Sequence, residues 1–103
     1  MFSSDPPIVT ARSSLARPGV EGRDNVTLNC RAAGSPAPSL AWTRASNPRQ
    51  VLATGPRLVF TPLDRRDDDT YNCVAENQHG TSQKSVKLEV YCEYSADFIP
   101  DHA

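Results

Sequence analysis

Five short runs of this chain alternate apolar with polar residues, and this alternation limits its folds more than any other feature. The runs are NVTLNC (25–30), LAWTR (40–44), RLVF (57–60), TYNCVAEN (70–77) and SVKLEVY (85–91). A period of two places successive side chains on opposite faces of a β-strand. Proline and glycine lie between the runs and interrupt any helical period. The sequence therefore predicts an all-β fold, a two-sheet antiparallel sandwich of about seven strands.

The same alternation predicts which side chains form the core. One face of the runs carries mostly apolar residues, and the other carries mostly polar ones. The expected inward residues are Val26, Leu28, Cys30, Leu40, Trp42, Leu58, Phe60, Tyr71, Cys73, Ala75, Val86, Leu88 and Val90. Hydrophobic residues make up 38% of the chain and there is a single tryptophan, so we expect this core to be thin.

Length and charge bound the classes of function. At 103 residues the chain is expected to hold one domain at 7–91, after an N-terminal linker at 1–6. Residues 92–103 lose the alternation and are expected to be a linker toward a following domain. A net charge of −1 argues against nucleic-acid binding, which depends on phosphate contacts. The sequence has no run of about 18 apolar residues, so we expect no membrane insertion by this segment.

Motifs for catalysis and metal binding are missing from the sequence. It contains no C-x-x-C, H-E-x-x-H, G-x-S-x-G or phosphate-binding loop. The two histidines, His79 and His102, do not form a metal cluster with the cysteines, and His79 is expected to be an exposed loop residue. We therefore expect a non-catalytic protein without a cofactor or a metal.

Cysteine, tryptophan and tyrosine residues recur at a characteristic spacing. Trp42 lies twelve positions after Cys30, and Tyr71 lies two positions before Cys73. Together with the stretches LVFTPLDRRDDDTYNC and CVAENQHG, this pattern resembles the immunoglobulin superfamily, in particular its I-set and C2-type domains. The resemblance covers about residues 7–91 and implies an immunoglobulin-like sandwich with Greek-key connections. It departs from the family pattern at Asp69, where a small residue is usual.

The resemblance implies a disulfide between Cys30 and Cys73, with Trp42 packed against it. Such a bridge closes a loop of about 43 residues and stabilises the fold by about 3–4 kcal/mol in the chain-entropy model. Two free core cysteines, as in sarcomeric I-set domains, are the alternative. The short separation of the two cysteines also implies that there is no room for the C′ and C″ strands of variable-type domains.

The acidic segment 64–69, DRRDDD, allows three interpretations. A calcium site is disfavoured because the carboxylates lack the spaced D-x-D-x-D-G geometry. A tyrosine corner is expected at Tyr71, whose hydroxyl returns to a backbone group a few residues upstream. Asp67 is expected to cap that turn and to meet an arginine, for which the candidates are Arg57, Arg65 and Arg66. A solvated turn is expected for the remaining aspartates, Asp64, Asp68 and Asp69.

For function, the resemblance implies a non-catalytic extracellular module of a multi-domain cell-surface receptor that mediates or spaces cell–cell adhesion and protein recognition. Such modules occur in neural and immune adhesion molecules and in siglec-like stalks. The intact protein is expected to be a type I membrane protein or secreted. The expected partners are another protein, a homophilic copy or neighbouring immunoglobulin-like domains. Nine of the eleven cations are arginine. A glycosaminoglycan-binding or matrix module is therefore an alternative, as is a ligand-binding module of a growth-factor-type receptor.

Three surface sites are predicted. Asn25 begins an N-x-T acceptor sequence, and a glycan there would make its sheet face unavailable to partners. Cys92 has no place in the family pattern and is expected to bridge to another domain, or to be a free thiol prone to oxidative dimerisation. The candidate interface on strands C, F and G consists of Thr43, Asn72, Val74, Glu76, Lys87 and Glu89. Its polar character favours weak, multivalent contact.

Overall fold

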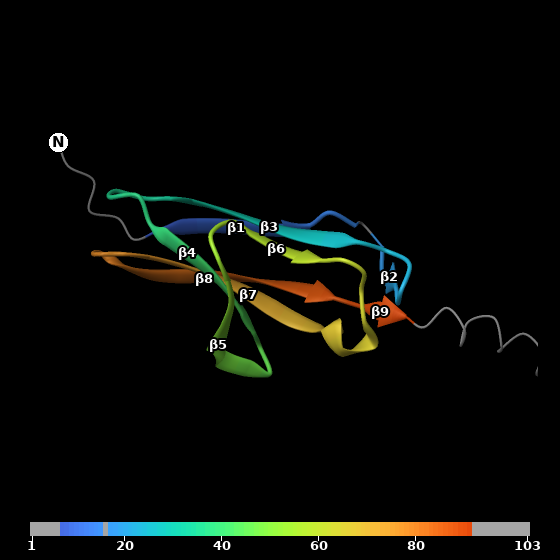
Figure 1. The fold of residues 1–103 in the computed structure, drawn as a ribbon. Helices are drawn as coiled ribbons and strands as arrows, with labels where there is room; N and C mark the ends of the chain where they lie inside the picture. Colours follow the sequence, from blue (N-terminus) through green and yellow to red (C-terminus); the bar gives the residue numbers. More distant parts are fainter. Residues whose placement is uncertain (1–6, 16, 92–103) are drawn as a thin grey trace, which may run out of the picture.

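Two β-sheets lie face to face in the computed structural model, which describes residues 7–15 and 17–91 (Figure 1). The predicted linkers 1–6 and 92–103, and with them Cys92, lie outside the described residues. The elements of the described part are β1 (Ile8–Ser13), β2 (Gly19–Val20), β3 (Val26–Ala33), β4 (Ser39–Arg44), β5 (Asn47–Thr54), β6 (Arg57–Phe60), the 3₁₀ helix η1 (Arg65–Asp67), β7 (Asp69–Asn77), β8 (Gly80–Leu88) and β9 (Val90–Tyr91).

Both large sheets are antiparallel. One sheet has the strand order β1-β3-β6, and the other has the order β5-β4-β7-β8. Figure 1 shows the three-stranded sheet above the four-stranded one, with β5 at the lower edge. The predicted all-β antiparallel sandwich is therefore confirmed.

The core lies between the sheets, on the faces that the alternation predicts. In β3, Val26, Leu28 and Cys30 are buried while the residues between them are more exposed. In β7, Tyr71 and Cys73 are fully buried in the same alternating pattern. All thirteen of the predicted inward residues are either buried in the core or packed against it.

A disulfide between Cys30 and Cys73 joins β3 to β7 and so links the two sheets. Trp42 is fully buried and is the cross-strand neighbour of Cys73. Its indole Nε1 donates a hydrogen bond to the backbone oxygen of Pro56 at 3.2 Å. The same oxygen accepts the Cys30 N–H at 2.8 Å. The bridge, the indole and the start of β6 are thus tied together, and the implied pairing of the cysteines is confirmed.

Strand β5 corrects the expectation that no C′ strand fits between the two cysteines. This eight-residue strand pairs with β4 at the edge of the four-stranded sheet, through four residue pairs with two shifts of register. Only Ala45 and Ser46 connect it to β4, and only Gly55 and Pro56 connect it to β6. Gly55 has a φ of 103°, which glycine adopts without steric cost. One extra strand fits because each connection needs just two residues.

The parallel pair of β2 and β9 was not predicted. Gly19 N–H donates to the Glu89 oxygen at 2.9 Å, and Glu21 N–H donates to the Tyr91 oxygen at 2.7 Å. Gly19 is buried, and a Cβ atom there would lie 2.1 Å from Cδ1 of the fully buried Leu63. Close approach of the backbone to the core therefore requires glycine at this position. Two-residue strands are too short to show an alternating pattern, so the sequence does not reveal them.

Candidate interaction surfaces

We call the outer face of β4, β7 and β8 the neutral face and define it by Ala41, Asn72, Val74, Glu76, Gln83, Ser85 and Lys87. Val74 lies at its middle, between its cross-strand neighbours Ala41 and Gln83. Glu76 and Lys87 lie toward opposite ends, paired with Thr81 and Thr70 respectively. The face therefore has an uncharged middle and one charge of each sign at its two ends.

Two residues of the predicted interface are not part of the accessible face. Thr43 is only 7% exposed, because β5 covers the edge of β4 and places Thr43 between Val51 and Asn72. Glu89 is half-buried in the break between β8 and β9, and its backbone oxygen is bound by Gly19 N–H. The expectation that Thr43 is exposed is therefore wrong. The accessible part of the predicted set is Asn72, Val74, Glu76 and Lys87.

The tyrosine corner forms as predicted. The Tyr71 hydroxyl donates to the backbone oxygen of Asp67 at 2.6 Å. Asp64 is the N-cap of η1: its carboxylate accepts the Arg66 N–H, and its own N–H donates to the Asp67 carboxylate, both at 2.8 Å. This reciprocal pair is a capping box. The Tyr71 ring packs edge-on against Phe60 at a centroid distance of 5.3 Å, so the turn is fixed to the core.

The arginine at this corner is Arg44 of β4, which was not among the predicted candidates. Its Nη2 donates to the Tyr71 hydroxyl at 2.9 Å and to the backbone oxygen of Arg66. Its Nε lies 3.1 Å from Oδ2 of Asp69, which also accepts the Ser46 hydroxyl at 2.6 Å. The guanidinium lies over the Tyr71 ring, 5.4 Å from its centroid. The departure from the family pattern at Asp69 thus supplies an ion-pair partner for Arg44.

These contacts shift two pKa values. Burial raises the pKa of Tyr71 to about 12, because a buried phenolate loses its hydration, and the nearby Arg44 only partly opposes this shift. The pKa of Asp69 is lowered, chiefly by the hydrogen bond from Ser46 and further by Thr70 N–H and Arg44. At neutral pH the corner therefore contains a neutral phenol and an ionised carboxylate.

The other aspartates of the acidic run also bind backbone groups. Asp68 accepts the Val90 N–H at 2.9 Å and ties the corner to β9. Asp64 and Asp68 are exposed, as the prediction of a solvated turn requires, but Asp64, Asp68 and Asp69 each accept a structural hydrogen bond as well. Within residues 7–15 and 17–91, His, Cys, Asp and Glu do not come together in groups of three or more that could hold a metal ion. The run builds the connection between β6 and β7.

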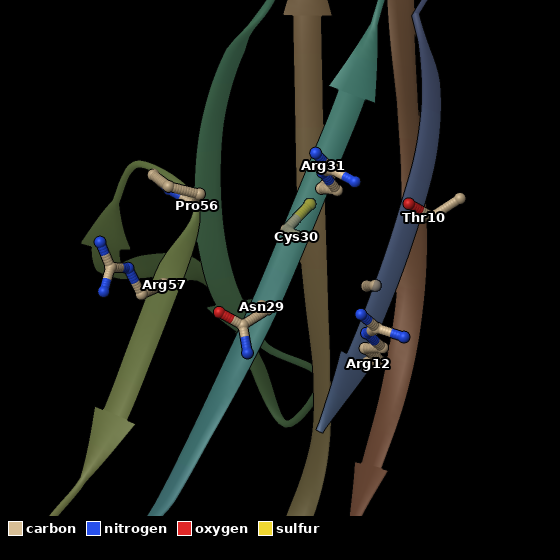
Figure 2. A pocket seen from close by; sticks show the side chains of 8 residues that line it. Thr10, Arg12, Asn29, Cys30, Arg31, Pro56 and Arg57 are labelled. Atoms are coloured by element: carbon tan, nitrogen blue, oxygen red, sulfur yellow. The ribbon is translucent and has the colours of Figure 1, made fainter. Parts of the chain in front are cut away.

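A second surface lies on the outer face of the three-stranded sheet, where an open depression of about 510 Å³ is found. We call it the basic depression and define it by Thr10, Ala11, Arg12, Asn29, Cys30, Arg31, Pro56 and Arg57. Asn29 of β3 is the cross-strand neighbour of Arg12 on β1 and of Arg57 on β6. Arg31 lies two residues further along β3, opposite Thr10. Figure 2 shows Asn29 between Arg57 and Arg12, with Arg31 further along the same strand.

Two other predicted residues lie at the surface. Asn25 is exposed directly before β3, and its glycosylation remains a prediction. His79 is exposed in the turn between β7 and β8, as expected. The described part of the chain has no helix with the length and apolar character needed to cross a membrane.

Known proteins resemble this chain in sequence. Schwann cell myelin protein of Coturnix japonica is 41% identical over 75 residues, which cover 69% of this chain and 12% of that protein. Neural cell adhesion molecule 1 of Gallus gallus is 28% identical over 103 residues, which cover 91% of this chain and 9% of that protein. The chain therefore spans only a small part of these relatives.

A solved structure and a family model also resemble this chain. The full ectodomain of mouse nectin-like molecule 4 superimposes with a TM-score of 0.66 at 31% identity, over 85% of this chain and 31% of that chain. A family model described as the immunoglobulin domain matches residues 6–77. Because that match covers more than half of the chain and the observed sandwich agrees with it, the chain belongs to the immunoglobulin domain family.

Proposed function

We propose that this chain is a non-catalytic, extracellular module of a multi-domain cell-surface protein, and that it contributes to cell–cell adhesion through its neutral face. The relatives support this proposal, since one of them is named as an adhesion molecule. The disulfide supports an extracellular setting, because such bridges persist in oxidising compartments. The exposed acceptor sequence at Asn25 is consistent with the same setting.

The observation that carries the proposal is the charge pattern of the neutral face. A second copy can face this one across a twofold axis that lies in the interface and crosses the strands at the middle of the face. This arrangement would bring its Lys87 toward Glu76, and its Glu76 toward Lys87. The uncharged middle, around Val74 and Asn72, would meet itself across the same axis. The face is therefore complementary to a second copy of itself, which favours a homophilic contact.

The strength of such a contact follows from its composition. The middle of the neutral face has no large aromatic side chain, and aromatic anchors provide most of the energy of tight interfaces. We therefore expect a weak pairwise contact that becomes effective when many copies act together, with gains of about 10²–10⁴ in avidity. Figure 1 shows that the described chain starts at one end of the sandwich and finishes at the other, as suits a module in a string.

Bead aggregation tests this proposal. Beads coated densely with the full chain, carrying Cys92→Ser to prevent intermolecular disulfides, are expected to aggregate, whereas the free chain stays monomeric at micromolar concentration. Beads coated with chain that has been reduced and alkylated at Cys30 and Cys73 provide the control, since the contact requires the folded sandwich. Coated beads that remain dispersed would contradict an adhesive role and leave the module as a spacer.

A further inference from the structure

We propose that the basic depression on the three-stranded sheet binds a sulfated polysaccharide. The proposal takes only the extracellular setting from the proposed function, and it concerns the opposite sheet from the neutral face. It rests on the convergence of Arg12, Arg31 and Arg57, which lie 19 and 26 positions apart in the sequence but on adjacent strands in the fold.

The three guanidinium groups are available for a ligand. Neighbouring strands lie about 4.8 Å apart, so Arg12 and Arg57, on either side of Asn29, project from points about 10 Å apart. Among the described residues, none of the three side chains has an ion-pair or hydrogen-bond partner, and the lining of the depression includes no carboxylate. By contrast, the guanidinium groups of Arg17 and Arg44 are each paired with an aspartate. The three arginines therefore give the depression a concentrated positive charge that no carboxylate in its lining neutralises.

The shape of the depression follows from the strand ends. Strand β6 begins at Arg57, and the preceding Pro56 contacts β3 through its backbone oxygen, which bonds the Cys30 N–H, so the edge of β3 beyond Cys30 has no β6 residue beside it. Figure 2 shows the chain turning away from β3 at Pro56. The floor is rigid because Cys30 is held by the disulfide and its N–H is bound by the Pro56 oxygen. The backbone of the site is therefore preformed, and binding a ligand needs to order only the arginine side chains.

The chemistry of the site favours a sulfated polysaccharide over a protein partner. The core of a protein interface is more apolar than the rest of the surface, whereas this surface has Asn29 at its middle with Arg12 and Arg57 on either side. The exposed apolar residues on the same sheet, Ile8 and Val59, lie apart from the depression and belong to different strands. Arginine binds planar arrays of anionic oxygens through two parallel hydrogen bonds, and Asn29 and Thr10 can bond sugar hydroxyls.

The predicted glycan at Asn25 would leave room at the depression for a thin polysaccharide chain but not for a protein. Asn25 lies four residues before Asn29, which is about 13 Å along an extended strand. A glycan there would obstruct a protein, because a standard interface covers about 800 Å² on each partner. A single polysaccharide chain needs only the depression. We therefore expect enzymatic removal of an Asn25 glycan to change polysaccharide binding by less than about threefold, within the range of exposed, uncharged contacts.

Heparin chromatography and a binding titration test the proposal directly. The full chain is compared with the triple variant Arg12→Ala/Arg31→Ala/Arg57→Ala and with the charge-matched control Arg49→Ala/Arg66→Ala/Lys84→Ala, whose three side chains are exposed outside the depression. We expect the unmodified chain and the control to be retained above about 0.15 M NaCl. The triple variant should elute earlier and bind heparin about tenfold more weakly, with a reduced salt dependence. Circular dichroism and thermal unfolding confirm that each variant is folded.

Three results would overturn the proposal. The first is elution of the unmodified chain at or below about 0.15 M NaCl. The second is equal weakening in the control, which would indicate net charge and not the depression. The third is displacement of heparin by poly-L-glutamate at equal charge concentration, which would indicate an acidic protein segment as the ligand. Because heparin binding needs no second protein, none of these results bears on bead aggregation through the neutral face.

Discussion

At the scale of single residues, the hydroxyl of Tyr71 has the clearest energetic role. It joins β7 to the backbone of Asp67 and accepts a hydrogen bond from Arg44, inside a region where the ring is fully buried. We expect Tyr71→Phe to lower the free energy of unfolding by about 1–3 kcal/mol, because the buried partners lose their bonds. Urea unfolding at neutral pH measures this loss. Tyr91→Phe is the matched control, because Tyr91 is 58% exposed and its replacement should have little effect.

The same residue predicts a pH dependence. Burial raises the pKa of Tyr71 from its ordinary value of 10.0 to about 12. The folded state therefore holds this proton more tightly than the unfolded state, and the associated stability is complete below pH 10. As the pH rises from 10 to 12, that stability should be lost, and the difference between the wild-type chain and Tyr71→Phe should shrink. A difference that stays constant or widens over this range would contradict the account.

Arg44 gives a third prediction. It bonds the Tyr71 hydroxyl, lies beside the Asp69 carboxylate and contacts the face of the Tyr71 ring. We expect Arg44→Ala to lower the free energy of unfolding by about 1.5–3 kcal/mol, as for hydrogen bonds to charged groups. Arg49→Ala removes the same charge from an exposed position of β5 and should change stability by less than about 0.5 kcal/mol. Equal effects of the two substitutions would show that the corner does not depend on Arg44.

The alternation in the sequence is enough to indicate that Arg44 points inward. Arg44 has the same parity as Leu40 and Trp42, so it is a charged residue at an inward position of β4. Such a residue needs a partner. Which carboxylate it meets cannot be derived, because Asp69 lies 25 positions away and the register of β4 against β7 is set only by the fold. The same limit hides the convergence of Arg12, Arg31 and Arg57, whose positions depend on two strand registers.

At the scale of elements, the strands whose apolar residues alternate clearly in the sequence were predicted, and β1, β2 and β5 were not. β3, β6, β7 and β8 show the expected faces because their apolar residues recur with a period of two. β5 has mainly polar, exposed residues, so its pairing with β4 depends on the short turns at both of its ends. Its presence also explains why Thr43, expected at the surface, is covered.

Strand β2, which the sequence does not reveal, gives a fourth prediction. Gly19→Ala would place a Cβ atom 2.1 Å from Cδ1 of Leu63, whose side chain is fully buried and cannot move freely. We expect a loss of about 1–3 kcal/mol, because the overpacked core must shift β2 away from β9. Amide hydrogen exchange should become faster at Gly19 and at Glu21, whose N–H groups bond the β9 region. Gly22→Ala is not a neutral comparison because Gly22 has a φ of 74°. Val20→Ala, which removes volume without overpacking, serves as the control and should cost less.

At the scale of the whole molecule, one disulfide-linked scaffold presents two outer faces with different chemistry. The neutral face is uncharged at its middle and suits a second protein surface, while the basic depression on the other sheet carries three arginines that have no partner among the described residues. Because the sheets are joined through Cys30 and Cys73, both faces are fixed relative to one core. The two surfaces can therefore be altered independently by substitutions on opposite sheets.

The central claim, that adhesion takes place through the neutral face, is tested most directly by bead aggregation with two matched substitutions. Val74→Glu places a charge at the middle of the neutral face, and Val59→Glu places the same charge on the outer face of β6. The account predicts that Val74→Glu abolishes aggregation of coated beads and that Val59→Glu leaves it unchanged, with both chains folded by thermal unfolding. Aggregation that survives Val74→Glu and is lost with Val59→Glu would contradict it.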